Sequence, residues 1–433
     1  MCPSGGVPGI EVAQSAASGT IEFIVAEVDC DLTGLAERRR RMSNVQNDRL
    51  MNVMSGWGRS SRRGLLTGAT RVAGGGAVAL AMGGIGLSRA RGVLAQDATP
   101  GADGTPETEM AGIDPQMQKI ISALTSFDNP PIPELNPFQA RQLPSFANAY
   151  QSVLSEEGKP AIEPVANVSH TVIPGPVDGI VARVYTPEGS GPFPVLVYFH
   201  GGGFVIANLD TYDASCRALA NAASCVVVSV AYRQAPENPF PAAVDDAYAA
   251  TQYVIANTAE FGGKAGVVAV GGESAGGNLA TVVCLRARDE GAALPVHQLL
   301  VYPLVTLAPE GEALESVAQY GQAKPLNADL LDWFGSFYAA DPSALTNPYG
   351  SPLAAADLSG IPPATVIAAQ IDPLQSQGSL YADALKAAGV DVTYTLYEGV
   401  THEFFGLTMV VDKSRDAVQE AADRLTASFD AAS

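Results

Sequence analysis

The most informative stretch of the chain reads Val-Val-Ala-Val-Gly-Gly-Glu-Ser-Ala-Gly-Gly-Asn at residues 267–278. Its four apolar residues predict a buried strand and the residues after Asn278 predict a helix, so Ser274 falls at the turn between them. Gly272 and Gly276 stand two residues before and after Ser274, where larger side chains would collide in a sharp turn. We therefore expect the hydroxyl of Ser274 to project clear of the end of a β-sheet.

Similar apolar runs occur on both sides of this stretch and alternate with helical patterns. Runs that are apolar almost throughout are typical of strands buried on both faces of a parallel sheet. The sequence therefore predicts an α/β fold with a mostly parallel central sheet and helices on both faces. The other expected strands are residues 180–185, 195–199, 225–230, 299–302, 364–369 and 392–396.

Two further polar residues follow expected strands. Asp372 comes after the strand at 364–369, and His402 comes after the strand at 392–396. Functional groups in open parallel sheets gather at the carboxyl ends of strands, so Ser274, Asp372 and His402 are expected to converge. A serine hydroxyl becomes a good nucleophile when a neutral imidazole takes its proton and a carboxylate orients that imidazole.

A glycine-rich loop, His200-Gly201-Gly202-Gly203, follows the strand at 195–199. Its small residues allow backbone N–H groups to face a ligand oxygen, and such donors stabilise the negative charge that develops during acyl transfer. We expect His200 to hold this loop by hydrogen bonding. His170 and His297 are expected to be structural or solvent-facing.

Composition excludes several functions. The 433 residues carry a net charge of −20, which repels nucleic acid. The five cysteines imply no disulfide scaffold, and no Cys/His cluster predicts a metal site. No phosphate-binding glycine motif fits, and we expect no cofactor.

The N-terminal residues 1–95 differ from the rest, because they contain 11 Arg, no Lys and 7 acidic residues. Ser61-Arg62-Arg63-Gly64-Leu65-Leu66, followed by an apolar stretch and Val93-Leu94-Ala95, resembles a twin-arginine export signal. We expect the twin-arginine machinery to export the chain to the periplasm, cell envelope or medium, with cleavage near Ala95. The alternatives are an uncleaved membrane anchor and a chance Arg-Arg pair before a buried helix. Residues 1–50 are interpreted as the result of a start codon assigned too far upstream.

Residues 96–112 are expected to form a disordered linker because Pro, Thr, Gly, Asp and Glu dominate them. One hydrolase-like domain then spans 113–433. Prolines divide 113–158 into short expected helices, and an irregular insert at 303–362 contains an amphipathic aromatic stretch at 327–338. These two segments are candidates for a cap over the site.

Residues 165–433 resemble the hormone-sensitive-lipase family of α/β-hydrolases. The resemblance rests on the glycine loop at 200–203, on Tyr-Arg-Gln-Ala-Pro-Glu at 232–237, on Gly-Glu-Ser-Ala-Gly-Gly-Asn at 272–278, on Asp-Pro-Leu at 372–374 and on His402. It implies a helical cap, Ser274 as nucleophile, His402 as base and Asp372 as its orienting group. It also implies an oxyanion hole made by the N–H groups of Gly202, Gly203 and Ala275.

Two departures from the family pattern lie beside the site: Glu273 stands where Asp is usual, and Glu403 stands where Gly usually follows the base. Glu403 places another carboxylate near the imidazole, so we expect it to raise the pKa of His402.

The leading hypothesis is hydrolysis of carboxylic esters with short to medium acyl chains, outside the cytoplasm and without a membrane span in the mature chain. An amide, lactone or carbamate substrate would suit the same residues. A non-catalytic hydrolase-like binding protein is the alternative from another class. The oligomeric state is left open, with a homodimer as one option.

Overall fold

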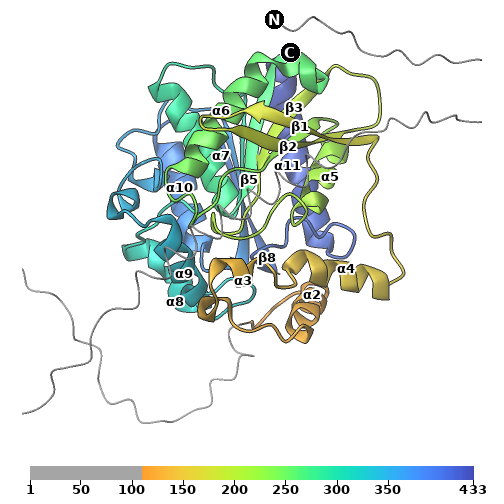
Figure 1. Ribbon diagram of the computed structural model, residues 1–433, viewed down its shortest axis with the longest axis vertical. Helices are drawn as coiled ribbons and strands as arrows, with labels where there is room; N and C mark the ends of the chain where they lie inside the picture. Colours follow the sequence, from red (N-terminus) through yellow and green to blue (C-terminus); the bar gives the residue numbers. More distant parts are fainter. Residues whose placement is uncertain (1–109) are drawn as a thin grey trace, which may run out of the picture. The chain divides into compact units, whose positions relative to one another are not determined.

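The computed structural model describes residues 110–433 (Figure 1). The expected export signal at 1–95, and the linker up to residue 109, lie outside the described residues. Among residues 110–433, no helix is long enough and apolar enough to cross a membrane.

An eight-stranded sheet forms the centre of the described fold, in the order β1-β2-β4-β3-β5-β6-β7-β8. β1 and β2 are antiparallel to their neighbours, whereas β4, β3 and β5 to β8 run parallel to one another. The predicted mostly parallel sheet is confirmed. The strands are β1 (Asn167–Pro174), β2 (Gly179–Thr186), β3 (Phe193–Phe199), β4 (Val226–Val230), β5 (Gly263–Glu273), β6 (Gln298–Val301), β7 (Ala364–Ile371) and β8 (Val392–Thr401).

Helices cover both faces of the sheet (Figure 1). Alternate residues of β3 divide between two cores: Val195 and Val197 belong to one, and Leu196 and Tyr198 to the other. Because both faces are covered, the central strands β3, β4, β6 and β7 are buried along almost their whole length. The first face carries α6 (Ala242–Ala256), α7 (Ala275–Asp289) and α10 (Gln375–Ala387), and the second carries α5 (Asp213–Ala222) and α11 (Asp412–Ala431).

The segment 113–158 forms short helices, as its prolines predict. Pro115 and Pro137 stand in the first turns of α2 (Pro115–Ser126) and α3 (Pro137–Ala140), where a missing N–H costs nothing. The side chains of Asp114 and Asn136 cap these helices by accepting hydrogen bonds from backbone N–H groups. The segment also contains η1 (Ile132–Glu134) and α4 (Phe146–Glu156).

The insert at 303–362 packs against this first segment. It contains α8 (Glu315–Tyr320) and α9 (Ala328–Tyr338), which lie with α2, α3 and α4 at the lower end of the molecule in Figure 1. The indole N–H of Trp333 on α9 donates a hydrogen bond to the carbonyl oxygen of Leu135 at 3.1 Å. Both segments therefore meet at one end of the sheet. Short 3₁₀ helices complete the insert: η3 (Gly311–Leu314), η4 (Pro342–Leu345) and η5 (Pro352–Ala354).

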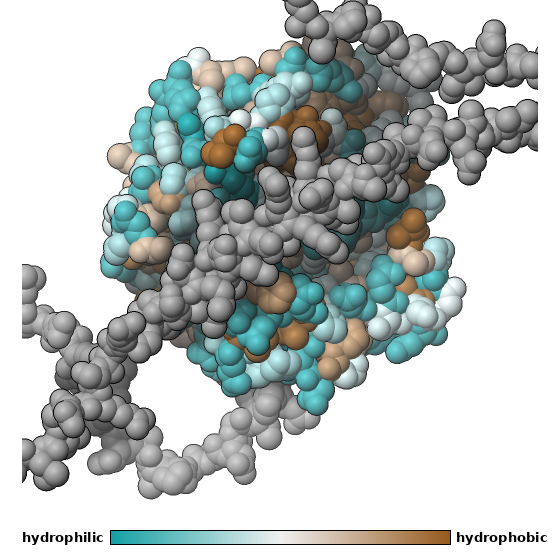
Figure 2. Space-filling view, in the orientation of Figure 1, coloured by the Kyte–Doolittle hydropathy of each residue, from teal (hydrophilic) through white to brown (hydrophobic). Residues whose placement is uncertain are grey.

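The visible surface of the described residues is predominantly hydrophilic, and apolar residues form small separate patches on it (Figure 2). Charged side chains are found mostly at such surfaces, because burying a charge away from water costs free energy.

Candidate active site

Ser274 occupies the turn between β5 and α7, as the glycine pattern predicts. Its φ and ψ are 57° and −117°, a strained conformation for a residue other than glycine, and its N–H donates to the carbonyl of Val301 at 2.9 Å. A methyl group on Gly276 would overlap the carbonyl oxygen of Phe199. This close approach requires glycine, and it lets α7 begin directly against the end of β3.

His402 and Asp372 meet although 30 residues separate them. The imidazole Nδ1 donates to Oδ2 of Asp372 at 2.7 Å, and the backbone N–H of Leu374 donates to the other carboxylate oxygen at 2.8 Å. Burial alone would lower the pKa of His402, but the adjacent Asp372 carboxylate outweighs burial and raises it above 6.5. The bond to Nδ1 leaves Nε2 as the nitrogen that can accept a proton.

The glycine loop winds through positive φ values, 96° at Gly202 and 59° at Gly203. Among the described residues, the N–H groups of these two glycines find no acceptor in the protein. His200 is buried, and its Nδ1 is 2.8 Å from the carbonyl oxygen of Gly201, while burial lowers its pKa to about 4. The hydroxyl of Tyr232 donates to the His200 carbonyl at 2.8 Å, and these contacts hold the start of the loop in place.

A cleft of about 1210 Å³ joins these groups. Ser274, His402 and Gly203 line it together with residues of both cap segments. Its apolar wall beside the glycine loop is formed by Ile206, Leu326, Leu330 and Phe334.

Arg141 fastens the first cap segment to the glycine loop, a role that sequence reasoning missed. Its guanidinium donates to the carbonyls of Val205 at 2.8 Å and Ala235 at 2.7 Å, and to both carboxylate oxygens of Glu237 at 2.8 Å. Glu237 belongs to the Tyr-Arg-Gln-Ala-Pro-Glu motif, but nothing in the sequence marks Arg141 as its partner.

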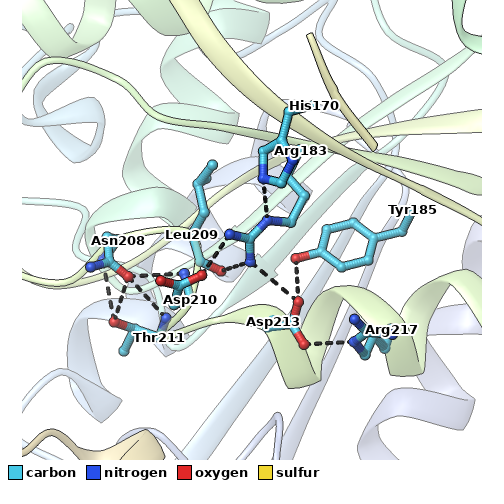
Figure 3. Close-up of polar contacts among 9 residues, drawn as sticks. All are labelled: His170, Arg183, Tyr185, Asn208, Leu209, Asp210, Thr211, Asp213 and Arg217. Carbon is cyan, nitrogen blue, oxygen red and sulfur yellow. Dashed lines mark hydrogen bonds and ion pairs between the residues drawn. The ribbon is translucent and has the colours of Figure 1, made fainter. Parts of the chain in front are cut away.

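A second arginine fixes the loop that leads into α5 (Figure 3). Arg183 of β2 donates to the Leu209 carbonyl, to Asp210 at 2.5 Å and to Asp213 at 3.3 Å, while its Nε donates to His170. Tyr185 and Arg217 also donate to Asp213, at 2.9 Å and 2.6 Å. The network holds the loop at 207–212, whose last residue, Tyr212, lines the cleft.

The remaining candidates have structural surroundings. His297 is buried between the hydroxyls of Thr365 and Ser428, each 2.9 Å from a ring nitrogen. Cys216, Cys225 and Cys284 are free and buried. In residues 110–433 no group of three or more His, Cys, Asp or Glu side chains is arranged to hold a metal ion.

Comparisons with known proteins agree with this fold. Residues 196–406 match the model of a family described by the alpha/beta hydrolase fold. Carboxylic ester hydrolase LipN of Mycobacterium tuberculosis is 41% identical over 277 residues, which are 63% of this chain and 73% of that protein. Esterase LipI of the same organism is 36% identical over 323 residues, covering 73% of this chain and 95% of that protein.

A solved structure of a Pyrobaculum calidifontis esterase superimposes with a TM-score of 0.66 at 38% identity, covering 74% of this chain and 100% of that one. The fold and the site define an α/β-hydrolase. This chain belongs to the α/β-hydrolase family that contains these esterases.

Proposed function

We propose that the chain is a serine carboxylesterase in which Ser274 is the nucleophile, His402 the general base and Asp372 its orienting group. The observation that carries this proposal is the 2.7 Å bond from His402 Nδ1 to Asp372, in the cleft that Ser274 also lines. The esterase names of the relatives support ester hydrolysis as the reaction.

The proposed reaction has two steps. Ser274 Oγ attacks the ester carbonyl carbon while His402 Nε2 takes its proton, and the oxyanion accepts hydrogen bonds from the N–H groups of Gly202, Gly203 and Ala275. The carbonyl re-forms as the bond to the alcohol breaks, and His402 returns the proton to the leaving alcohol. Water, deprotonated by His402, then attacks the acyl-enzyme and releases the acid and Ser274.

The cleft favours esters with short to medium acyl chains. Its apolar wall lies beside the glycine loop, so an acyl chain attached to the reacting carbonyl would bury its methylene groups there. Phe334 belongs to this wall, and its ring lies against Gly203, where it would overlap any side chain at that position.

The test is a panel of p-nitrophenyl esters of increasing acyl length, with one amide and one lactone, offered to the parent and to Ser274→Ala. We expect the parent to prefer the short and medium esters and Ser274→Ala to lose about 10³-fold or more in kcat. A phosphonate ester that forms a covalent adduct should add to the parent, but not to Ser274→Ala, by intact mass. Equal hydrolysis by both proteins would overturn the assignment, and preference for the amide or lactone would change the substrate class.

Asp372→Asn tests the orienting role separately. The neutral amide of Asn does not hold the Nδ1–H group as the carboxylate does, so the imidazole adopts the wrong tautomer. We therefore expect kcat to fall by about 10⁴-fold. An unchanged kcat would exclude Asp372 from the mechanism.

We also propose that the chain is exported by the twin-arginine machinery, on the support of the Arg62-Arg63 pair and the Val93-Leu94-Ala95 sequence. Conversion of both arginines to lysine should retain the protein in the cytoplasmic fraction. The exported parent should begin at Gln96 by N-terminal sequencing. Export of the lysine variant at the parent's level would contradict the proposal.

A further inference from the structure

Two carboxyl groups, one buried and one half-buried, lie beside the reacting residues and have no part in the mechanism described above. Glu273 directly precedes Ser274 and is 1% exposed, and Glu403 directly follows His402 and is half-buried. Both residues line the cleft. Burying a carboxyl group costs free energy unless hydrogen bonds or charges compensate, so each of these groups needs a physical explanation.

Tyrosine hydroxyls compensate both carboxyl groups. Tyr198 and Tyr302 each donate a hydrogen bond to one oxygen of Glu273. Tyr212 donates to Oε1 of Glu403 at 2.6 Å. These tyrosines come from β3, from the residue after β6 and from the residue before α5, so the network joins separate parts of the sheet below the cleft.

The network touches the imidazole and the glycine loop. The ring of Tyr302 packs on that of His402 with centroids 4.5 Å apart. The hydroxyl of Tyr212 lies against Gly201, where it would overlap any side chain at that position. Tyr302 therefore connects Glu273 to the base, and Tyr212 connects Glu403 to the glycine loop.

Glu403 is held in an unfavourable backbone conformation, with φ at 69°. The left-handed region costs a residue other than glycine about 1–2 kcal/mol, and the turn itself could be made by glycine without that cost. The hydrogen bond from Tyr212 holds the carboxylate of Glu403 and offsets part of this strain.

The charges around this pair are coupled. Burial raises the pKa of Glu403, while His402 and Tyr212 oppose the rise. Burial, followed by the charge of Glu403, raises the pKa of Glu273 to about 7. The titratable groups that face the pair or the imidazole are Tyr198, Tyr212, Cys216, Tyr302 and Asp372.

We propose that Glu403 is a positioning residue for His402: its negative charge, next to the imidazole in the cleft, stabilises the imidazolium formed when Ser274 loses its proton. Glu273, which Tyr302 connects to the imidazole, contributes to the same effect more weakly. This role rests on the proposed function, because it acts through the Ser274–His402 proton transfer.

The first experiment compares the pH profiles of kcat/KM for the parent, Glu403→Gln and Glu273→Gln. Loss of the Glu403 charge should move the acidic limb, which reports His402 in the free enzyme, to lower pH by about 1 unit. If the imidazolium loses the same stabilisation in the transition state, kcat falls by up to about tenfold. Glu273→Gln should move the limb in the same direction by a smaller amount.

Glu420→Gln is the matched control. Glu420 on α11 accepts the Tyr397 hydroxyl at 2.7 Å and the Thr395 hydroxyl at 2.6 Å, but it lies outside the cleft. Its profile should superimpose on that of the parent. Glu403→Gly provides a second variant that removes the charge and the backbone strain together, so a folding defect in Glu403→Gln cannot hide the result.

A purely structural role makes a different prediction: kcat falls equally at every pH and the acidic limb stays in place. That outcome in both Glu403 variants would overturn the proposal.

A second readout does not depend on activity. In Ser274→Ala, the low-field proton NMR signal of His402 Nδ1–H can be followed against pH, with and without Glu403→Gln. The titration midpoint should fall in the double variant. A midpoint that stays in place would refute the role of Glu403. A shift of the midpoint together with a parent protein that hydrolyses no ester would refute only the proposed function.

Discussion

Arg141 and Glu237 form a two-bonded ion pair, with both N–H···O distances at 2.8 Å, across 96 residues of sequence. Exposed ion pairs contribute little to stability, and Glu237 is 58% exposed. The two bonds from Arg141 to the carbonyls of Val205 and Ala235 are less accessible to water, and they connect the cap to the glycine loop. Arg141 therefore contributes more by positioning the cap through these two hydrogen bonds than by its ion pair with Glu237.

Replacing Arg141 by Lys should keep the charge but lose the fork of hydrogen bonds. We expect KM to rise severalfold, and the free energy of unfolding to fall by about 1–2 kcal/mol because two carbonyl groups lose their partners. Steady-state kinetics and urea unfolding measure the two effects. Arg424→Lys is the control, because Arg424 pairs with Asp391 only at 3.8 Å. Equal effects of the two substitutions would show that the cap does not depend on Arg141.

Phe334 should set the acyl-length preference, because it lines the cleft next to Gly203. Phe334→Ala is expected to raise the ratio of kcat/KM for a long ester over a short ester by at least about fivefold. Phe337 on the same helix packs on Trp333 with centroids 4.9 Å apart and lies outside the cleft wall. Phe337→Ala should leave the ratio unchanged, and a similar change in both variants would count against a specific role of Phe334.

Gly276→Ala and Gly335→Ala place the same methyl group in two different surroundings. At Gly276 it would overlap the Phe199 carbonyl, so we expect a loss of at least about 3 kcal/mol in stability, or no folded protein. At Gly335, within α9, nothing lies within 4 Å, and alanine should stabilise by up to about 1 kcal/mol. Thermal unfolding of both variants gives the comparison. A stable, active Gly276→Ala protein would contradict the close packing of α7 on β3.

Glu273 should make stability decrease as the pH rises. Burial and the Glu403 charge raise its folded-state pKa to about 7 from 4.5, so the folded protein holds a proton that the unfolded chain has lost. The contribution of Glu273 to stability is complete below the unfolded pKa and disappears as the pH rises through about 7. Between about pH 5 and about pH 8, the free energy of unfolding should fall less for Glu273→Gln than for the parent. The difference between the two falls should be on the order of 1–3 kcal/mol. Urea unfolding at both pH values tests this, and parallel losses in the two proteins would refute it.

The amino-acid sequence was sufficient for the features that depend on local pattern. The apolar runs predicted the parallel strands, since a strand covered on both faces is apolar at nearly every position. The glycines around Ser274 predicted the turn between β5 and α7, because only glycine permits the approach to Phe199. The residues after the strands at 364–369 and 392–396 indicated the pair that lies 2.7 Å apart in the fold, Asp372 and His402.

Only the tertiary structure revealed the supports of the site. Tyr198 lies in an apolar run, and its aromatic ring fits the buried pattern of that run. The neighbouring sequence therefore gives no sign that its hydroxyl donates a hydrogen bond to Glu273. Tyr212 and Glu403 are 191 residues apart, and Arg141 and Glu237 are 96 apart. A hydrogen bond between distant residues depends on how the chain brings two elements together, and a single sequence has no period or motif that records such a pairing. The sequence therefore specified which groups could react, and the packing of the cap, the loops and the sheet decided which side chains hold them in place.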